Sequence, residues 1–265
     1  MTLQAPLALE PRCVARDTYL IGAWVPIPTL GALPLNAFVI KAAQPVLVDT
    51  GMAAMREHFL ESIQAVLDPQ DLRWIWITHM DADHVGNLAA VLERAPRARV
   101  VTTFIGLAKM GLLGLPQDRA YLVNPGQELD VGDRRLLAAA PPIFDAPETN
   151  GFLDAKSRAL YCSDCFGAAQ PEVTEWANEV PPETLARAMA VWANADAPWL
   201  GMVDRAVLRE RLRQYAGMGA DVMLGSHLQP AKQMASSLAR AAEDAVAGPA
   251  FVGPDQATVG SAALV

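Results

Sequence analysis

The sequence is poor in the features that mark secreted and membrane-bound proteins. It has only three cysteines among 265 residues, and this small, odd number argues against a disulfide framework and suits a reducing compartment. No apolar run approaches the length of about 18 residues that a membrane span needs. The N-terminal segment also lacks a basic stretch followed by an apolar one. We therefore expect a cytoplasmic protein with no membrane partner.

Basic charge is scarce as well. The chain has 21 Lys and Arg against 29 Asp and Glu, which gives a formal net charge of −8. A nucleic-acid-binding protein normally presents a basic patch, and the one arginine-rich stretch, residues 209–213, is typical of the solvent face of a helix. We expect no nucleic-acid partner. Apolar residues make up 52% of the chain, which is ample for a large core.

Strand-like and helix-like segments alternate along the first half of the chain. Strands are predicted at 36–41, 45–48, 72–77 and 100–103, and later at 129–131, 135–139 and 159–162; helices are predicted at 53–67, 86–94, 182–195, 203–216 and 231–246. This alternation of strands and helices is typical of sheets covered by helices. No linker is evident, so we expect one domain over residues 1–247 and a loosely ordered tail over 248–265.

The predicted helix at 182–195 carries an apolar stripe of Leu185, Met189 and Trp192. Such a stripe covers a sheet or serves a homodimer. The sequence leaves both open.

Four potential metal ligands fall within six residues, directly after a predicted buried strand: His79, Asp81, Asp83 and His84. Packing gives no reason to crowd them there, and two carboxylates this close repel each other unless a cation lies between them. The alternative is a polar loop in which Asp83 caps the next helix. We favour the metal site because two of the four histidines of the chain are in this loop.

Three later residues complete a set with this loop. Asp164 and His227 each follow a predicted strand, and Asp145 lies between an apolar run and Pro147. Strand ends are where open α/β sheets gather ligands. Alone, Asp145 would be read as a turn former, but together with the loop the three residues predict a metal centre.

The residues also support a family resemblance. The order Val48-Asp49-Thr50-Gly51, His79-x-Asp81-x-Asp83-His84, Asp145, Asp164 and His227 resembles the metallo-β-lactamase superfamily over nearly the whole chain. The resemblance implies an α/β fold, the αββα sandwich, with two mixed β-sheets and helices on both outer faces. The common family pattern is His-x-His-x-Asp-His, and Asp81 replaces its second histidine. The nearest look-alike is the di-iron domain of flavodiiron and oxygen-binding di-iron proteins, which has a carboxylate there; Asp145 stands where that group has histidine.

Roles follow from the resemblance. It implies His79, Asp81 and Asp145 around one metal, Asp83 and His227 around the other, and Asp164 as the bridge between them. His84 is a ligand in the hydrolases but usually not in flavodiiron proteins, so its role is open; with Asp83 it is assigned to catalysis. Asp49 resembles the carboxylate that orients a ligand histidine.

The ligand types favour particular metals. An oxygen-rich set suits harder ions, so we expect two metal ions, with iron favoured and manganese or zinc as alternatives. The first hypothesis is a di-iron centre that binds or reduces a diatomic, dioxygen or nitric oxide. Flavodiiron proteins also carry a flavodoxin domain. We find no phosphate-binding loop and expect no FMN domain in this chain, so reduction would need an external electron-transfer protein.

Two other functions stay open. Two metal ions can hold a hydroxide and polarise a carbonyl or phosphoryl oxygen, which would make the chain a hydrolase of a lactone, thioester or phosphodiester. A non-catalytic sensor of a gas or metal, working through a partner protein, is the third hypothesis. Cys162 and Cys165 flank Asp164 but are expected to be small buried hydrophobes rather than a redox pair.

Overall fold

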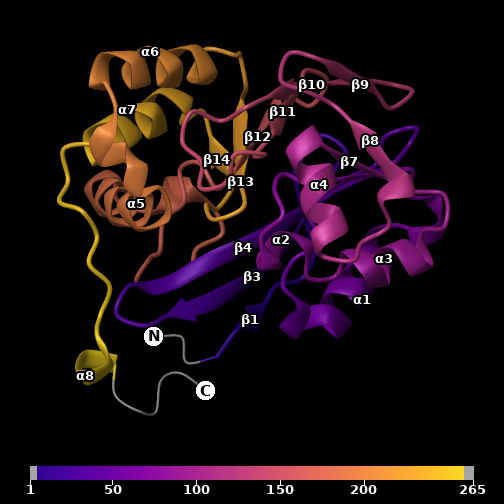
Figure 1. The fold of residues 1–265 in the computed structure, drawn as a ribbon, viewed down its shortest axis with the longest axis horizontal. Helices are drawn as coiled ribbons and strands as arrows, with labels where there is room; N and C mark the ends of the chain where they lie inside the picture. The colour runs from indigo at the N-terminus through magenta and orange to yellow at the C-terminus, as the bar shows by residue number, and fades with distance from the viewer. Residues whose placement is uncertain (1–4, 260–265) are drawn as a thin grey trace.

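The structure is a computed structural model and describes residues 5–259. Figure 1 shows two β-sheets packed face to face between two groups of helices. The first sheet has the order β1-β3-β4-β5-β6-β7-β8, with β2 also paired to β3. Its strands are β1 (Leu7–Ala8), β2 (Arg12–Ala15), β3 (Thr18–Ile27), β4 (Gly31–Ile40), β5 (Val46–Val48), β6 (Trp74–Trp76), β7 (Arg99–Thr102) and β8 (Ala120–Leu122). From β5 to β8 the strands run parallel.

The second sheet has the order β14-β13-β12-β11-β10-β9. Its strands are β9 (Glu128–Asp130), β10 (Arg135–Ala139), β11 (Gly151–Asp154), β12 (Ala159–Ser163), β13 (Val222–Gly225) and β14 (Ala231–Lys232). Only β12 and β13 are parallel neighbours, and the other pairs are antiparallel. Both sheets are therefore mixed, as the resemblance implied.

The helices divide between the two sheets. The first group comprises α1 (Arg56–Val66), α3 (Leu88–Arg94) and α4 (Phe104–Leu112); the second comprises α5 (Pro182–Asp196), α6 (Arg205–Ala216) and α7 (Ala235–Ala245). The short helix α2 (Ala82–Val85) lies in the ligand-bearing loop, and α8 (Gln256–Val259) follows the second group. The 3₁₀ turns are η1 (Ala53–Met55), η2 (Pro69–Asp71), η3 (Gln117–Arg119), η4 (Ala177–Glu179) and η5 (Pro198–Met202).

Three apolar clusters separate the four layers. One joins α1, α3 and α4 to the first sheet, through side chains such as Phe59 and Val91. The second fills the space between the sheets and includes Trp76 and Phe152, whose rings lie 4.4 Å apart. The third joins α5, α6 and α7 to the second sheet and includes Leu212. Alternating apolar clusters of this kind define the αββα sandwich, and the expected fold class is confirmed.

Some elements differ from the expectation. Strand β3 and helix α4 were not predicted, and residues 231–232, expected to begin a helix, form β14 instead. The apolar stripe of α5 buries Leu185 and Met189 against the second sheet, so it covers a sheet within the chain. The single-domain boundary at residue 247 stays a prediction, and residues 260–265 of the predicted tail lie outside the described residues. Within the described range, no helix combines the length and apolar character needed to cross a bilayer.

Candidate metal centre

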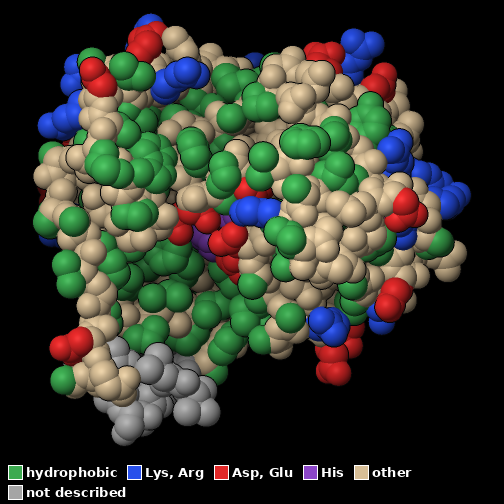
Figure 2. All heavy atoms as spheres, viewed as in Figure 1, with side chains coloured by type: hydrophobic (Ala, Val, Ile, Leu, Met, Phe, Trp, Pro, Cys, Tyr) green, Lys and Arg blue, Asp and Glu red, His purple; other side chains and the backbone are tan. Residues whose placement is uncertain are grey.

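The expected ligands meet where several strands of both sheets end. His79 follows β6 in the first sheet, whereas Asp164 and His227 follow the parallel strands β12 and β13 of the second. The loop and α2 carry Asp81, Asp83 and His84, and Asp145 lies between β10 and β11. Figure 2 shows acidic and histidine side chains in a hollow near the middle of this face, with apolar side chains around it.

The three imidazoles turn the same atom toward Asp164. Nε2 of His79 and Nε2 of His227 each lie 3.4 Å from Oδ2 of Asp164, and Nε2 of His84 lies 3.3 Å from its Oδ1. Ligand atoms that share an ion lie about 2 Å from it and therefore roughly 3 to 3.5 Å from each other. The observed separations match that spacing, and Asp164 occupies the middle of the cluster.

The remaining carboxylates divide between two sides of Asp164. Oδ2 of Asp145 lies 3.7 Å from Nε2 of His79, and one oxygen of Asp81 belongs to the same group. Oδ2 of Asp83 lies 3.3 Å from Nε2 of His227 and 3.6 Å from that of His84. The structure thus brings together all seven expected residues. His79, Asp81 and Asp145 form one group, and His84, whose role the sequence left open, lies with Asp83 and His227 in another.

Several atoms of the cluster are buried without a hydrogen-bond partner in the described part of the chain. They are Nε2 of His79, Nε2 of His84, Oδ1 of Asp145 and Oδ1 of Asp164. A buried polar atom with no partner is costly, and native structures tolerate it where an ion or water fills the gap. These orphaned donors and acceptors fit a pair of metal ions.

The opposite nitrogen of each imidazole is held by a separate part of the chain. Nδ1 of His79 lies 3.2 Å from Oγ of Ser163, Nδ1 of His84 lies 2.9 Å from Oδ2 of Asp49, and Nδ1 of His227 donates to the carbonyl oxygen of Pro34 at 3.1 Å. Such contacts fix the tautomer and the ring direction of metal-ligating histidines. They leave Nε2 of each ring directed into the cluster.

Asp49 organises the first sheet's side of the site. Its carboxylate accepts hydrogen bonds from the backbone N–H and the hydroxyl of Thr78, both at 2.8 Å, besides the contact with His84. Its backbone is left-handed, with φ 57°, and Ser163 on the other sheet has φ 52°. Non-glycine residues adopt this conformation at a cost that the surrounding structure must offset. Asp49 and Ser163 each contact the Nδ1 atom of a ligand-set imidazole.

The cluster is strongly coupled by charge. Burial alone would lower the pKa of His227, but Asp164 and Asp83 raise that pKa to about 9. Burial alone would raise the pKa of Asp164, but the three imidazoles hold that pKa well below its ordinary value. In the absence of a cation, the raised pKa values of His84 and His227 therefore favour their protonated forms, which balance the buried carboxylates.

The capping alternative for Asp83 does not fit the structure. Asp83 lies inside α2, and neither α2 nor α3 has a side-chain hydrogen bond at its N-cap. The residue at the start of α3 is Asn87. Asp83 is instead directed at His84 and His227.

Two acidic residues near the cluster escaped the sequence analysis. Asp196, the last residue of α5, offers an oxygen within 4.8 Å of the ligand atoms of Asp145 and Asp164. Burial and the charge of Asp164 raise the pKa of Asp196 to about 7. Glu148, whose side chain is buried, accepts from the backbone N–H of Met80 at 3.2 Å and pairs with Lys109 at 2.6 Å. The signal for Asp196 was an acid one turn after Trp192, on the apolar face of its helix.

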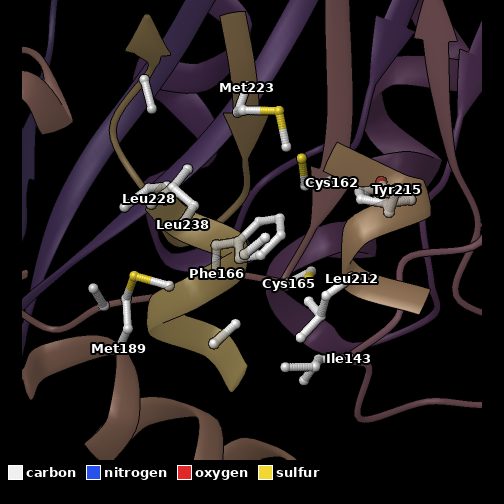
Figure 3. Packing of buried hydrophobic residues seen from close by; sticks show 14 of the residues in the cluster. Ile143, Cys162, Cys165, Phe166, Met189, Leu212, Tyr215, Met223, Leu228 and Leu238 are labelled. Atoms are coloured by element: carbon white, nitrogen blue, oxygen red, sulfur yellow. The ribbon is translucent and has the colours of Figure 1, made fainter. Parts of the chain in front are cut away.

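The cysteines take no part in the cluster. Cys162 and Cys165 are buried and free, and Cys13 is exposed and free. Figure 3 shows Cys162 and Cys165 among apolar side chains such as Met223 and Leu212. Burial raises the pKa of Cys162 to about 12. Both buried thiols therefore behave as small hydrophobes.

Comparisons with known proteins concern the family and the fold. Residues 30–142 match the model of the metallo-beta-lactamase superfamily. Several of its relatives are named as flavoproteins. It is 31% identical over 134 residues to a protein named diflavin flavoprotein A 2 from Nostoc sp., and 25% identical over 174 residues to rubredoxin-oxygen oxidoreductase from Megalodesulfovibrio gigas.

Solved structures of flavodiiron proteins share the fold. The rubredoxin oxygen:oxidoreductase from Desulfovibrio gigas superposes with a TM-score of 0.76 at 20% identity, covering 90% of this chain and 61% of that one. The flavodiiron protein from Giardia intestinalis gives 0.77 at 19% identity, covering 90% and 59%.

The chain matches only part of its curated relatives. The alignments cover 50% of this chain and 23% of the Nostoc protein, and 65% of this chain and 43% of the oxidoreductase. The activities in those names therefore belong to longer proteins. What the solved structures show directly for this chain is the fold.

Proposed function

We propose that this chain is a dinuclear metal protein, with iron as the favoured ion, that binds or reduces a small diatomic, dioxygen or nitric oxide. The residues that would hold the ions are His79, Asp81, Asp83, His84, Asp145, Asp164 and His227. The observation that carries the proposal is the convergence of three Nε2 atoms on Asp164 at 3.3 to 3.4 Å, with several of these atoms left without hydrogen-bond partners among the described residues.

The donor types support iron. Carboxylates outnumber imidazoles in the set, and hard oxygen donors suit iron or manganese better than an all-imidazole site would. When bound, such ions supply a binding position for the diatomic and the means to exchange electrons with it. Asp49, Ser163 and the Pro34 carbonyl keep the three imidazoles oriented toward the ions.

The surroundings of the centre support a small, weakly polar ligand. The ring of Trp192 packs 5.4 Å from that of His227, and apolar side chains surround the hollow that holds the cluster (Figure 2). Apolar surroundings of this kind favour a diatomic over a charged substrate because they offer it few hydrogen-bonding groups. Reduction would draw electrons from an external electron-transfer protein, as the name rubredoxin-oxygen oxidoreductase suggests for a relative; a sensor would need none. The three free thiols suit the cytoplasm.

Iron loading tests the proposal. Protein loaded with ferrous iron under anaerobic conditions should bind two ions per chain, and its optical spectrum should change on addition of dioxygen or nitric oxide. An Asp164→Ala variant treated in the same way should give neither result. A wild-type protein that binds no iron, or whose iron does not respond to either gas, would refute the proposal.

A hydrolase is the second candidate, and one observation favours it. His84 directs Nε2 into the cluster, 3.3 Å from Asp164 and 3.6 Å from Asp83, as the ligand histidine of the hydrolases does. In that case Asp83 and His84 would be the catalytic residues. Zinc-loaded protein tested on lactones, thioesters and phosphodiesters decides the matter, because zinc-dependent cleavage lost in His84→Ala would favour this function over gas binding.

A further inference from the structure

Glu148 is a buried carboxylate that the proposed centre does not use. Its side chain is 0% exposed, and its oxygen Oε2 has no hydrogen-bond partner in the described part of the chain. The other oxygen, Oε1, accepts from the backbone N–H of Met80 at 3.2 Å and lies 2.6 Å from Nζ of Lys109. A buried charge is costly unless it is paired and hydrogen-bonded. The compensation for burying this carboxylate therefore depends on two contacts of a single oxygen.

These contacts join the two segments that supply one group of candidate ligands. Met80 directly follows His79, and Glu148 comes three residues after Asp145. His79, Asp81 and Asp145 place ligand atoms within 4.8 Å of one another, so they would serve one ion. Glu148 thus ties the backbone beside one ligand of that ion to the turn that carries another.

A second contact lies on the other side of His79. The N–H of Asn150 donates to the carbonyl oxygen of Thr78 at 2.9 Å. The segment that runs from Asp145 to Asn150 therefore holds the chain both before and after His79. The contact before His79 joins two backbone groups and can form with many side chains, whereas the contact after it needs the carboxylate of Glu148.

Helix α4 supplies the counter-ion. Gly106 lets this helix lie close to the ligand-bearing segment, because a Cβ atom there would come within 3.2 Å of Cε of Met80. Three residues later, Lys109 reaches Glu148 with a side chain that is 35% exposed. The ammonium group keeps part of its hydration, so the pair costs less than one in which both charges are buried. Helix α4 therefore balances the charge of Glu148 from the solvent side.

We infer that Glu148 is a positioning residue for the ion at His79 and Asp145, and that Lys109 compensates its charge and holds it in place. The inference rests on the proposed dinuclear centre and adds to it two residues outside the ligand set. Support of this kind fixes the ligands relative to each other before the ion binds. His227 lies on a different segment, so the ion that it holds should depend less on Glu148.

Chelator competition tests the inference. Metal-free protein is loaded anaerobically with ferrous iron, and bound iron is counted after equilibration with increasing concentrations of a ferrous chelator. The wild type should hold two ions per chain. In Glu148→Ala, the N–H of Met80 loses its acceptor, so the affinity for one of the two ions should fall by roughly 10-fold or more, while the affinity for the other changes less.

Three further variants separate the hydrogen bond from the charge. Glu148→Gln keeps an oxygen that can accept from Met80, so it should bind iron more nearly like the wild type than Glu148→Ala does. Lys109→Met leaves Glu148 without a counter-ion and should weaken the same ion, whereas Lys109→Arg should restore its binding. Glu128→Ala removes a more exposed carboxylate, which pairs with Arg135 at 3.3 Å, and is the matched control.

Histidine resonances identify the ion that is weakened. Zn²⁺ is diamagnetic, so the ring resonances of His79 and His227 can be compared by NMR in zinc-loaded protein at increasing chelator concentration. In Glu148→Ala, His79 should return to its metal-free position at a lower chelator concentration than in the wild type, while His227 stays metal-bound. A side chain that only supports the fold would lower the urea midpoint without affecting one histidine alone.

The outcomes separate the two proposals. A wild type that binds no iron would refute the dinuclear centre itself. Two ions in the wild type, with unchanged competition in both Glu148→Ala and Lys109→Met, would overturn the positioning role and leave the centre standing. Equal weakening of both ions, with His79 and His227 released together, would overturn the assignment to one side. If Glu148→Ala does not fold, the two variants of the partly exposed Lys109 decide the question.

Discussion

Oδ2 of Asp49 lies 2.9 Å from Nδ1 of His84, and the same carboxylate holds the backbone and hydroxyl of Thr78. A single buried side chain, 2% exposed, therefore fixes both the direction of one imidazole and the position of the residue that precedes His79. This arrangement couples the turn after β5 to the turn after β6.

Substituting Asp49 should weaken metal binding without removing a ligand. In Asp49→Asn, the amide NH₂ faces a donor from Thr78 or His84, so metal affinity should fall by roughly 10- to 100-fold. Unfolding free energy should fall by about 1–3 kcal/mol. Calorimetric metal titration and urea unfolding measure the two effects. Asp68→Asn, which removes the charge of an exposed capping residue, is the control, and equal metal affinity in both variants would contradict the assignment.

Removing the central carboxylate should affect both metal positions. Asp164 faces all three imidazoles, so Asp164→Ala should lower the metal content to less than about half of the wild-type value, because each ion loses a shared ligand. Metal analysis of protein purified without chelator provides the measurement. An unchanged stoichiometry would exclude Asp164 as the bridge.

Acid should destabilise the protein partly through Asp133. Burial alone would raise the pKa of Asp133, but hydrogen bonds from Lys156, the N–H of Ala43 and Arg134 hold that pKa well below its ordinary value. A depressed folded-state pKa contributes stability above the unfolded pKa of about 4, and this contribution is lost as the pH falls below it. Asp133→Asn should therefore be less stable at neutral pH and lose less on acidification. Parallel urea midpoints for Asp133→Asn and wild type across that range would contradict this.

The buried thiols should be unreactive in the folded protein. Cys13 is exposed, whereas Cys162 and Cys165 are buried and their pKa values are raised by burial. A chromogenic disulfide reagent should label one thiol per chain in buffer and three in denaturant, because only the thiolate reacts. The Cys13→Ser variant should show almost no labelling in buffer. Rapid labelling of that variant would indicate that the third apolar cluster opens readily.

Much of the site was predictable because its residues follow strands. His79, Asp164 and His227 each come within a few positions of the end of an apolar strand, and the αββα fold brings those ends to one edge. Asp145 was weaker evidence, since an acid before a proline also suits an ordinary turn. Its place in the set became clear only from the residues that surround it.

Other features depended on tertiary contacts. Strand β3 was missed because its residues are mostly buried on both sides, without the alternation that marks a half-buried strand. Helix α4 contains Gly106 and Gly111 in a nearly continuous apolar run, which gives no clear helical period. Asp196 was missed because its one local signal, a place one turn after Trp192 on the apolar face of the helix, does not by itself separate a functional acid at a helix end from a solvated one. Only the approach of α5 to the Asp145 loop does so.

The hydrogen bond from His227 to the Pro34 carbonyl joins a strand of the first sheet to a loop of the second. Asn36, two residues later in β4, adds to this contact between the sheets. Its Nδ2 donates to the carbonyl oxygens of Gly225 and Leu228 at 2.9 and 2.7 Å. An ion bound by both His79 and Asp164 would link the two sheets at the same edge, because His79 follows a strand of the first sheet and Asp164 a strand of the second. Removing the ions with a chelator would then weaken the contact between the two sheets as well as inactivate the centre. The melting temperature of the protein would therefore rise with metal occupancy.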